Sequence, residues 1–425
     1  MDIAINPERS SWKSFCVRPS DENPVVRERV EKIIDRVREG GDRALRELAA
    51  EIDGFVPSSF EAGPEDFEKA AAAVDDSLKE AVALAASNIK AFHEAQLPET
   101  VEVTTRPGVR CIQKPVPIEK VGLYIPGGTA PLFSTVLMLA IPAKIAGCRE
   151  IVLCTPFGKD GRIAPAVLYA ASYCGVDRVF GIGGAQAVAA MAFGTESVPA
   201  VDKIFGPGNQ YVMAAKQMLG GREVAVDMPA GPSEVMVIVD SASNPAFAAA
   251  DLLSQAEHGR DSQVVLLSSD AAMAEAVSAE VGRQLAVLGR AELAEEALSH
   301  SHFIVLPGED EIVDFANMYA PEHLIVETSE PWNIVGRISA AGSVFVGAYS
   351  PESAGDYASG TNHTLPTSGW AHSFSGVGVD SYMRRMTIQE LSREGLEGLA
   401  PAIMRMADAE GLQAHANAAR IRIYE

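Results

Sequence analysis

Residues 150–194 read EIVLCTPFGKDGRIAPAVLYAASYCGVDRVFGIGGAQAVAAMAFG. Twice in this stretch, a short run rich in Val, Ile, Leu and Phe is followed by a longer, alanine-rich apolar run. Glycine or proline lies near the point where one kind of run gives way to the other. A strand followed by a helix, repeated in this way, is typical of a parallel α/β sheet.

The same alternation continues on both sides of this stretch. It adds VGLYIPGG with STVLMLAIPAKIAG before it, and DKIFGPG with NQYVMAAKQMLGG after it. A second series of apolar runs then follows: EVMVIVD, QVVLLSS, HFIVLPG and GSVFVGA. We therefore predict an α/β protein with two Rossmann-like parallel-sheet domains, consistent with an old duplication.

Both ends of the chain look helical. Residues 23–55 and 75–96 carry apolar residues at helical spacing, with a break at Gly40-Gly41, and the last fifty residues, from Gly376, are polar and helical again. The predicted domain limits are an N-terminal segment at 1–20, a discontinuous first α/β domain at 21–120 and 235–375, a second α/β domain on the nucleotide side at 121–234, and a helical C-terminal tail at 376–425.

The composition limits the classes of function. The 425 residues carry a net charge of −22 without a long basic run, which argues against nucleic acid as a partner. No unbroken apolar run reaches the roughly 18 residues typical of a membrane span, and no signal peptide is recognisable. The five cysteines are scattered without a CxxC pair, so we expect a reduced compartment and a cytoplasmic enzyme.

Several predicted strands of the first series end in glycine. These positions are Gly127-Gly128, Gly183-Gly184, Gly206 and Gly208. Ligands of such folds lie at the carboxyl ends of the strands, where the backbone must approach them closely. A nucleotide is compatible with these turns, but none is a G-x-G-x-x-G fingerprint, and plain tight turns explain them equally well.

The segment DLLSQAEHGRDSQ is predicted to contain the end of a helix that has Asn244 as its N-cap and Pro245 at its first position, and that stops at Gly259. Gln255 and His258 are then three residues apart on one helical face and can both offer a ligand to one metal ion. Alone this signal is weak, because a histidine near a helix end is more often a surface or hydrogen-bonding residue.

Two further segments support the interpretation that the protein is a metal-dependent enzyme. MYAPEHLIV places Glu322 next to His323, and both side chains can transfer protons. The loop YSPESAGDYASGTNHTLPT is rich in turn formers and carries Asp356 and His363. Glutamine, histidine and aspartate ligands suit a borderline divalent ion such as zinc.

Long motifs along the chain resemble the histidinol dehydrogenase family. They are VGLYIPGGTAPLFSTVLMLAIPAKIAGC, DMPAGPSEVMVIVD, DLLSQAEHGRDSQ, YAPEHL, GDYASGTNHTLPT and ADAEGLQAHANA, in the order of the family and over nearly the whole chain. The resemblance implies oxidation of L-histidinol to L-histidine through the aldehyde, with two NAD⁺ and one zinc ion per site, in a homodimer with exchanged tails.

The resemblance also implies roles for individual residues. The implied zinc ligands, which also contact the substrate, are Gln255, His258, Asp356 and His415. Glu322 and His323 match the proton-transfer pair, and both are also implied to contact the substrate. Further implied substrate contacts are Ser233, His363 and Glu410, and the implied nucleotide contacts are Tyr124, Gln186 and Asn209. His415 and Glu410 lie in the tail, which is expected to complete the site of the partner subunit.

The sequence leaves three alternatives open. Aldehyde oxidation can run through a cysteine thiohemiacetal, and Cys111, Cys148 and Cys154 lie in the α/β region, although none has a neighbouring histidine. A related zinc- and NAD-dependent dehydrogenase can act on another small alcohol. The third alternative is a zinc-dependent sensor that has no catalytic turnover. The intact Glu322–His323 pair argues against this function.

Overall fold

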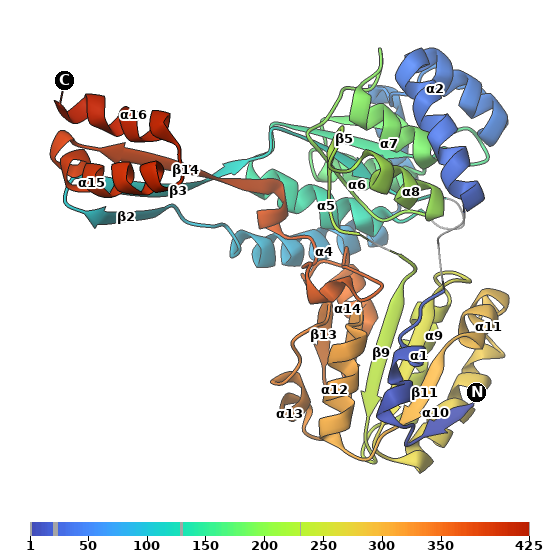
Figure 1. The fold of residues 1–425 in the computed structure, drawn as a ribbon. Helices are drawn as coiled ribbons and strands as arrows, with labels where there is room; N and C mark the ends of the chain where they lie inside the picture. The colour runs from blue at the N-terminus through green and yellow to red at the C-terminus, as the bar shows by residue number, and fades with distance from the viewer. Residues whose placement is uncertain (1, 20–23, 128–130, 230, 425) are drawn as a thin grey trace.

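The computed structural model describes residues 2–19, 24–127, 131–229 and 231–424. Two parallel sheets with helices on both faces lie next to each other, and a thin arm extends away from them (Figure 1). The predicted boundary at residues 20 and 21 lies outside the described residues. Among the described helices, none is both long and apolar enough to cross a membrane.

The first sheet confirms the four predicted strand–helix units. Its five parallel strands have the order β6-β5-β4-β7-β8. Their bounds are β4 Lys120–Tyr124, β5 Glu150–Thr155, β6 Arg178–Gly181, β7 Lys203–Phe205 and β8 Ala225–Val226. The crossover helices are α5 Phe133–Ala146, α6 Pro165–Tyr173, α7 Gly184–Phe193 and α8 Gln210–Leu219.

The second sheet has six parallel strands in the order β1-β11-β10-β9-β12-β13. The strands are β1 Ile3–Ile5, β9 Glu234–Val239, β10 Gln263–Ser268, β11 His302–Val305, β12 His323–Val326 and β13 Ser343–Val346. Its helices are α1 Trp12–Phe15, α9 Pro245–Ala256, α10 Ala271–Leu285, α11 Ala291–Ser299, α12 Glu309–Tyr319, α13 Pro331–Val335 and α14 Glu352–Tyr357. The strands β1 and β12 are not among the predicted runs.

Helices bury both faces of each sheet, so the central strands are apolar without alternation. In β9, every residue is buried. Helices α9, α10 and α11 cover one face of the six-stranded sheet, and residues of α1, α12 and α13 pack on the other. The two sheets therefore have separate cores and form a rigid base for residues at their ends.

The N-terminal helices correct the predicted domain grouping. They are α2 Pro24–Leu48, η2 Ala49–Asp53, α3 Pro64–Ala73 and α4 Asp76–Glu94. The chain bends at Gly41, as predicted, with φ +50°. The apolar face of α2, with Val30 and Ile34, packs against α7 and α8, while α3 and α4 pack on α6 and α5. These helices thus belong with residues 121–234 and not with 235–375, whereas β1, η1 Arg9–Ser11 and α1 join the six-stranded sheet.

The predicted helical tail begins instead with a short 3₁₀ turn, η4 Val379–Tyr382, and a nine-residue strand, β14 Met383–Leu391. This strand pairs with β3 Val109–Pro117 over its whole length, and β3 pairs with β2 Val101–Arg106. The partner strand lies far away in sequence, so local pattern does not predict this pairing. Only α15 Arg393–Ala409 and α16 Gln413–Tyr424 are the expected helices.

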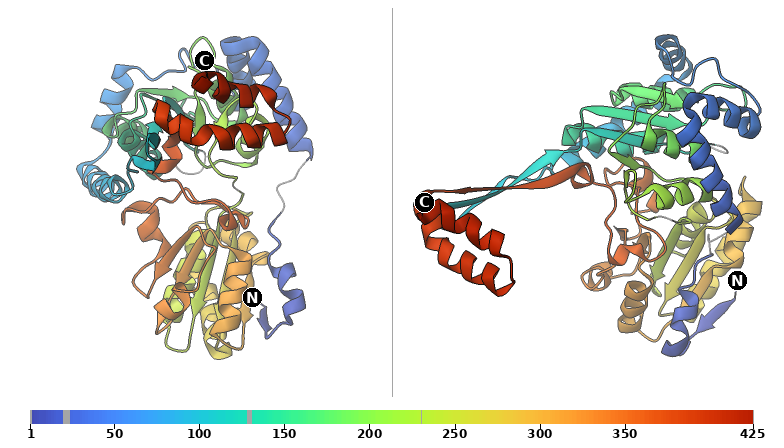
Figure 2. Two further views of the ribbon diagram at one scale, coloured as in Figure 1. Left: turned by 60° about the vertical axis from the view of Figure 1, so that its left-hand side comes forward. Right: turned by 45° about the horizontal axis from the view of Figure 1, so that its top comes forward.

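The strands β2, β3 and β14 form an arm that carries α15 and α16 at its far end (Figure 2). Most of its residues are exposed, including apolar ones such as Val101, Val103, Met386 and Ile388. Three strands without a packed core gain little stability from burial within one chain. Exposed apolar residues of this kind are typical of a surface that contacts another one.

Candidate active site

Residues predicted to carry the chemistry gather in a cleft where the two sheets face each other. This cleft of about 350 Å³ is lined by residues 206–210, which follow β7, and by Ser233, His258 and Glu322 from the six-stranded sheet side. The five-stranded sheet meets the cleft with its carboxyl ends, as predicted. The six-stranded sheet meets it with its amino ends, because Glu234 and His323 are the first residues of β9 and β12.

Glu322 and His323 are both buried at the start of β12. Helix α12 ends at Tyr319, and the left-handed residue Ala320, with φ +52°, turns the chain toward the strand. The Glu322 carboxylate accepts a hydrogen bond of 2.9 Å from the backbone N–H of Glu234. Its Oε2 atom also lies 3.6 Å from Nδ1 of His323. The two predicted proton-transfer groups are therefore adjacent and fixed by the sheet.

Gln255 and His258 lie together at the end of α9, as predicted. Asn244 caps the start of the helix with its side chain. The helix ends at Ala256 and not at Gly259, but the N–H of His258 still donates to the carbonyl of Gln255 at 3.1 Å. This extra turn keeps Nδ1 of His258 2.9 Å from Oε1 of Gln255. Gln255 is buried, whereas His258 opens into the cleft.

The glycine-rich loop brings Asp356 and His363 to the same place. Oδ1 of Asp356, in α14, lies 3.6 Å from Nε2 of His323. Nδ1 of His363 donates to the backbone carbonyl of Asp356 at 3.0 Å, which fixes its tautomer. Its Nε2 atom lies 3.2 Å from the hydroxyl of Thr135 in α5. His363 thus connects the loop with the domain across the cleft.

Glu352 is a site residue that the sequence analysis did not single out. It is fully buried, and its Oε1 lies 3.7 Å from Nδ1 of His323. When the Gln255 amide is turned so that its nitrogen and oxygen exchange places, the nitrogen donates to Glu352 and to Nδ1 of His258, and the oxygen accepts from the N–H of Glu234. Glu352 precedes Asp356 by four residues, one turn of the same helix, and this spacing is the signal that points to it.

Burial and charge shift the pKa values of the site. Burial raises the pKa of Glu322 to about 8, which brings its proton exchange near neutral pH. Burial lowers the pKa of His323, but the carboxylates of Glu352, Glu322 and Asp356 outweigh it and raise the pKa to about 10. Burial also opposes ionisation of Asp356, yet the nearby His323 ring, whose Nε2 lies 3.6 Å from Oδ1, leaves the pKa of Asp356 below its usual value. Asp356 is therefore an anion.

The donor set fits a zinc ion. Although His258 opens into the cleft, desolvation by surrounding atoms lowers its pKa and favours the neutral imidazole, the form that binds metal. The amide oxygen of Gln255, in the orientation that faces His258, and the anionic carboxylate of Asp356 complete three donors of types that zinc accepts. Ligand atoms of His323, Glu352 and Asp356 also lie within 4.8 Å of one another. Asp356 thus belongs both to the predicted ligands and to this acidic cluster.

The predicted nucleotide and substrate contacts fall into two groups. Ser233 and Asn209 line the cleft, and the Asn209 side chain caps the start of α8. Tyr124 and Gln186 lie at the carboxyl end of the five-stranded sheet and are buried. The hydroxyl of Tyr124 accepts from the backbone N–H of Gly184 at 3.0 Å, which links the end of β4 to the start of α7. Gly128 of the first glycine pair lies outside the described residues.

Glu410 and His415 do not join the other predicted site residues within one chain. Glu410 follows α15, and His415 lies in the first turns of α16, at the far end of the arm (Figure 1). Both are exposed. A single chain therefore brings together three of the four predicted metal ligands and leaves the fourth on a projecting arm.

Comparisons with known proteins agree with the motifs. A family model described as histidinol dehydrogenase matches residues 16–423. A histidinol dehydrogenase of Bacteroides fragilis is 54% identical over 425 residues, which cover 100% of this chain and 99% of the relative. One from Shigella sonnei is 54% identical over 396 residues, covering 93% and 90%. The crystal structure of histidinol dehydrogenase from Elizabethkingia anophelis superposes with a TM-score of 0.97 at 46% identity, covering 100% of this chain and 98% of that one.

Proposed function

The chain belongs to the histidinol dehydrogenase family of oxidoreductases, and from this premise we propose a specific reaction for it. The reaction is the zinc-dependent, NAD-linked, four-electron oxidation of L-histidinol to L-histidine through bound L-histidinal, which ends histidine biosynthesis. The observation that carries the proposal is the buried Glu322–His323 pair, with Asp356 beside His323 and Gln255 beside His258, at a cleft that Glu322 and His258 line.

Gln255, His258 and Asp356 would hold the zinc ion, with His415 of a second chain as the fourth ligand. When bound, the cation would orient the substrate and offset the carboxylate charge that raises the pKa of His323. The substrate's polar groups would contact Ser233 and His363 at the cleft, together with Glu410 from the second chain. The exposed apolar arm supports this arrangement, because its surface needs a partner.

His323 would accept the alcohol proton as hydride leaves the substrate for the nicotinamide. Its ring lies between two carboxylates, with Oε1 of Glu352 3.7 Å from Nδ1 and Oδ1 of Asp356 3.6 Å from Nε2. Glu322 would take a proton from the water that attacks the aldehyde, and a pKa of about 8 suits a group that must also release this proton. His323 would then assist the second oxidation.

Tyr124, Gln186 and Asn209 would contact the nucleotide at the carboxyl ends of the five-stranded sheet. Asn209 and the glycines at 206 and 208 line the cleft, where backbone can approach a ligand closely. A glycine is required at 206 because its φ is +123°, and an added Cβ would lie 2.1 Å from the carbonyl oxygen of Tyr124.

The test is NADH formation from L-histidinol with metal-replete protein. We expect about one zinc per chain and loss of turnover after chelation, while most of the fold remains, because two large apolar cores support it. The variant His258→Asn should reduce bound zinc, measured by atomic absorption. Full activity of metal-free protein would contradict the metal role, and turnover of other small alcohols but not histidinol would contradict the substrate.

The cysteine route makes a different prediction. Cys148 and Cys154 are buried, and burial raises the pKa of Cys148 to about 12 and that of Cys154 still further, so neither forms the nucleophilic thiolate readily. We expect Cys148→Ala and Cys154→Ala to keep most of the NADH-forming activity. A loss as large as that of a His323 variant would revive a covalent thiohemiacetal.

A further inference from the structure

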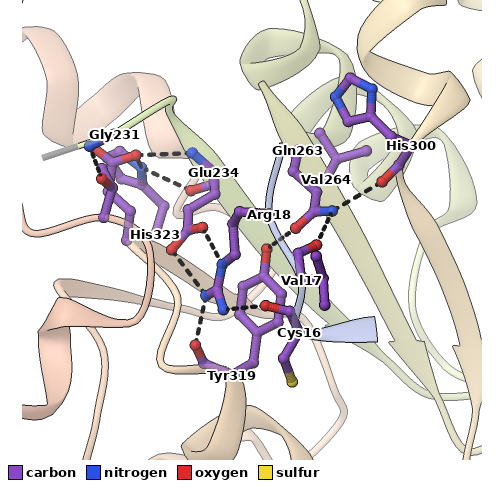
Figure 3. A network of polar contacts seen from close by, with 12 residues as sticks. Cys16, Val17, Arg18, Gly231, Glu234, Gln263, Val264, His300, Tyr319 and His323 are labelled. Carbon is purple, nitrogen blue, oxygen red and sulfur yellow. Dashed lines mark hydrogen bonds and ion pairs between the residues drawn. The ribbon is translucent and has the colours of Figure 1, made fainter. Parts of the chain in front are cut away.

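Arg18, from the N-terminal segment, forms a buried ion pair close to the catalytic pair (Figure 3). Its Nε donates to Oε2 of Glu234 at 2.8 Å, and its Nη2 donates to Oε1 at 3.2 Å. The two side chains are 12% and 1% exposed. Such a bidentate salt bridge fixes both the distance and the orientation of the carboxylate.

Arg18 also holds the end of helix α12. Its Nη2 donates to the carbonyl of Tyr319 at 2.6 Å, and its guanidinium carbon lies 3.6 Å from the centre of the Tyr319 ring. Carbonyls at a helix C-terminus lack intrahelical partners, and a cation is favourable there. Tyr319 is three residues before Glu322, so this contact fixes the turn that leads into the catalytic pair.

Glu234 carries the effect to the catalytic side chains through its backbone. Its N–H donates to Oε2 of Glu322 at 2.9 Å, and its carbonyl lies 3.4 Å from Nδ1 of His323. The side chain of Glu234 thus binds Arg18, while its backbone contacts the catalytic pair. A shift of Glu234 would move both proton-transfer groups.

Other contacts hold Arg18 itself in place. The hydroxyl of Tyr319 donates to Oε1 of Gln263 at 2.7 Å, and Nε2 of Gln263 donates to the carbonyl of Val17 at 3.2 Å. Nη1 of Arg18 donates to the carbonyl of Cys16 at 2.9 Å. The strand β1 of the same segment pairs with β11. The arginine is therefore anchored to the sheet from which the catalytic residues project.

We propose that Arg18 is a positioning residue for Glu322 and His323, acting through Glu234 and the C-terminus of α12. The inference rests on the proposed function, since it concerns the geometry of that proton transfer. Without Arg18, the Glu234 carboxylate would be buried and unpaired, so the start of β9 would shift to reach water or another donor. The catalytic pair would then lose its alignment with the substrate.

The test compares Arg18→Met with three other variants in the zinc-loaded enzyme. We expect Arg18→Met to lower kcat by roughly 10- to 100-fold with KM and zinc content little changed, because displacing a catalytic group slightly has effects of this size. Arg18→Lys keeps the positive charge but cannot form the bidentate pair of hydrogen bonds with the Glu234 carboxylate, and its kcat should be intermediate. Arg18→Met combined with Glu234→Gln removes the unpaired charge and should regain most of the lost kcat.

Arg9→Met is the matched control. Arg9 lies in the same segment and pairs with Asp314 of the same helix α12, but both side chains are exposed. We expect wild-type kcat for it. Arg18→Met should also raise the solvent deuterium isotope effect on kcat, since a misaligned base makes proton transfer slower, and a purely structural role would leave this value unchanged.

Amide hydrogen exchange gives a readout that does not need turnover. Exchange at Glu234 should accelerate in Arg18→Met, or in Arg18→Lys if the methionine variant does not fold, and not in Arg9→Met. Wild-type kcat per bound zinc in Arg18→Met, or unchanged exchange at Glu234, would overturn the inference. Absence of histidinol turnover in wild type would instead contradict the proposed function, while the exchange experiment would still decide the role of Arg18.

Discussion

Replacing His323 by asparagine is expected to lower kcat for L-histidinol oxidation by roughly 10²–10⁴, the usual range for loss of a positioned acid–base group. Asparagine keeps a polar side chain of similar reach but accepts no proton in this pH range. The ring of His323 lies 3.6–3.7 Å from the carboxyl groups of Glu322, Glu352 and Asp356 and is the group that we propose to receive the substrate's proton.

Steady-state NADH formation measures the effect, and metal analysis accompanies it. Zinc content should stay unchanged, because His323 is not a proposed ligand. The exposed His372 offers a matched control, since its ring faces the carbonyl of Met318 at 3.4 Å and lies outside the proposed site, and His372→Asn should retain wild-type kcat. A His323→Asn enzyme with normal kcat would remove His323 from the mechanism, and loss of zinc would make it a ligand.

Hybrid dimers are expected to regain activity that both parent variants lack. His258→Asn and His415→Asn should each give nearly inactive homodimers, because each removes one proposed metal ligand. If tails are exchanged, one site of the mixed dimer carries both defects and the other carries none. Activity per hybrid dimer should then return to about half of wild type, a simple count of intact sites in a symmetric pair.

The two chains can carry different affinity tags, so that only hybrid dimers survive two purification steps. The control is a dimer of two differently tagged chains that both carry His258→Asn, and this dimer should stay inactive. If the tail folded back onto its own chain, every site would keep one defect and no activity would return. The arm makes this second outcome unexpected, because α16 lies far from α9 within one chain (Figure 1).

Local sequence signals account for much of the fold and of the site. The four strand–helix units at residues 121–221 are confirmed because each repeat places its apolar residues and its glycine within about 30 residues. Gln255 and His258 could be paired for the same reason, since one turn of backbone joins them. The loop at residues 350–367 could be singled out by its density of turn formers and polar side chains.

Other features depend on contacts between segments far apart in the sequence. The amino ends of β9 and β12 meet at the cleft because the two strands are neighbours in the sheet, although 88 residues separate Glu234 from Glu322. Glu352 also lies close to His323, and Arg18 close to Glu234, because the tertiary fold brings together segments that are far apart in the sequence. Sequence periodicity describes which face of an element is apolar, but not which other element will cover it.

The sequence alone therefore determined the two α/β units, the family and the candidate residues, since those depend on local patterns and long motifs. The tertiary structure decided that the N-terminal helices cover the five-stranded sheet, that residues 383–391 form a strand, and that Glu410 and His415 lie away from their own chain's cleft. The physical reason is that burial of apolar surface favours whichever distant partner completes the packing, and that choice depends on the whole chain.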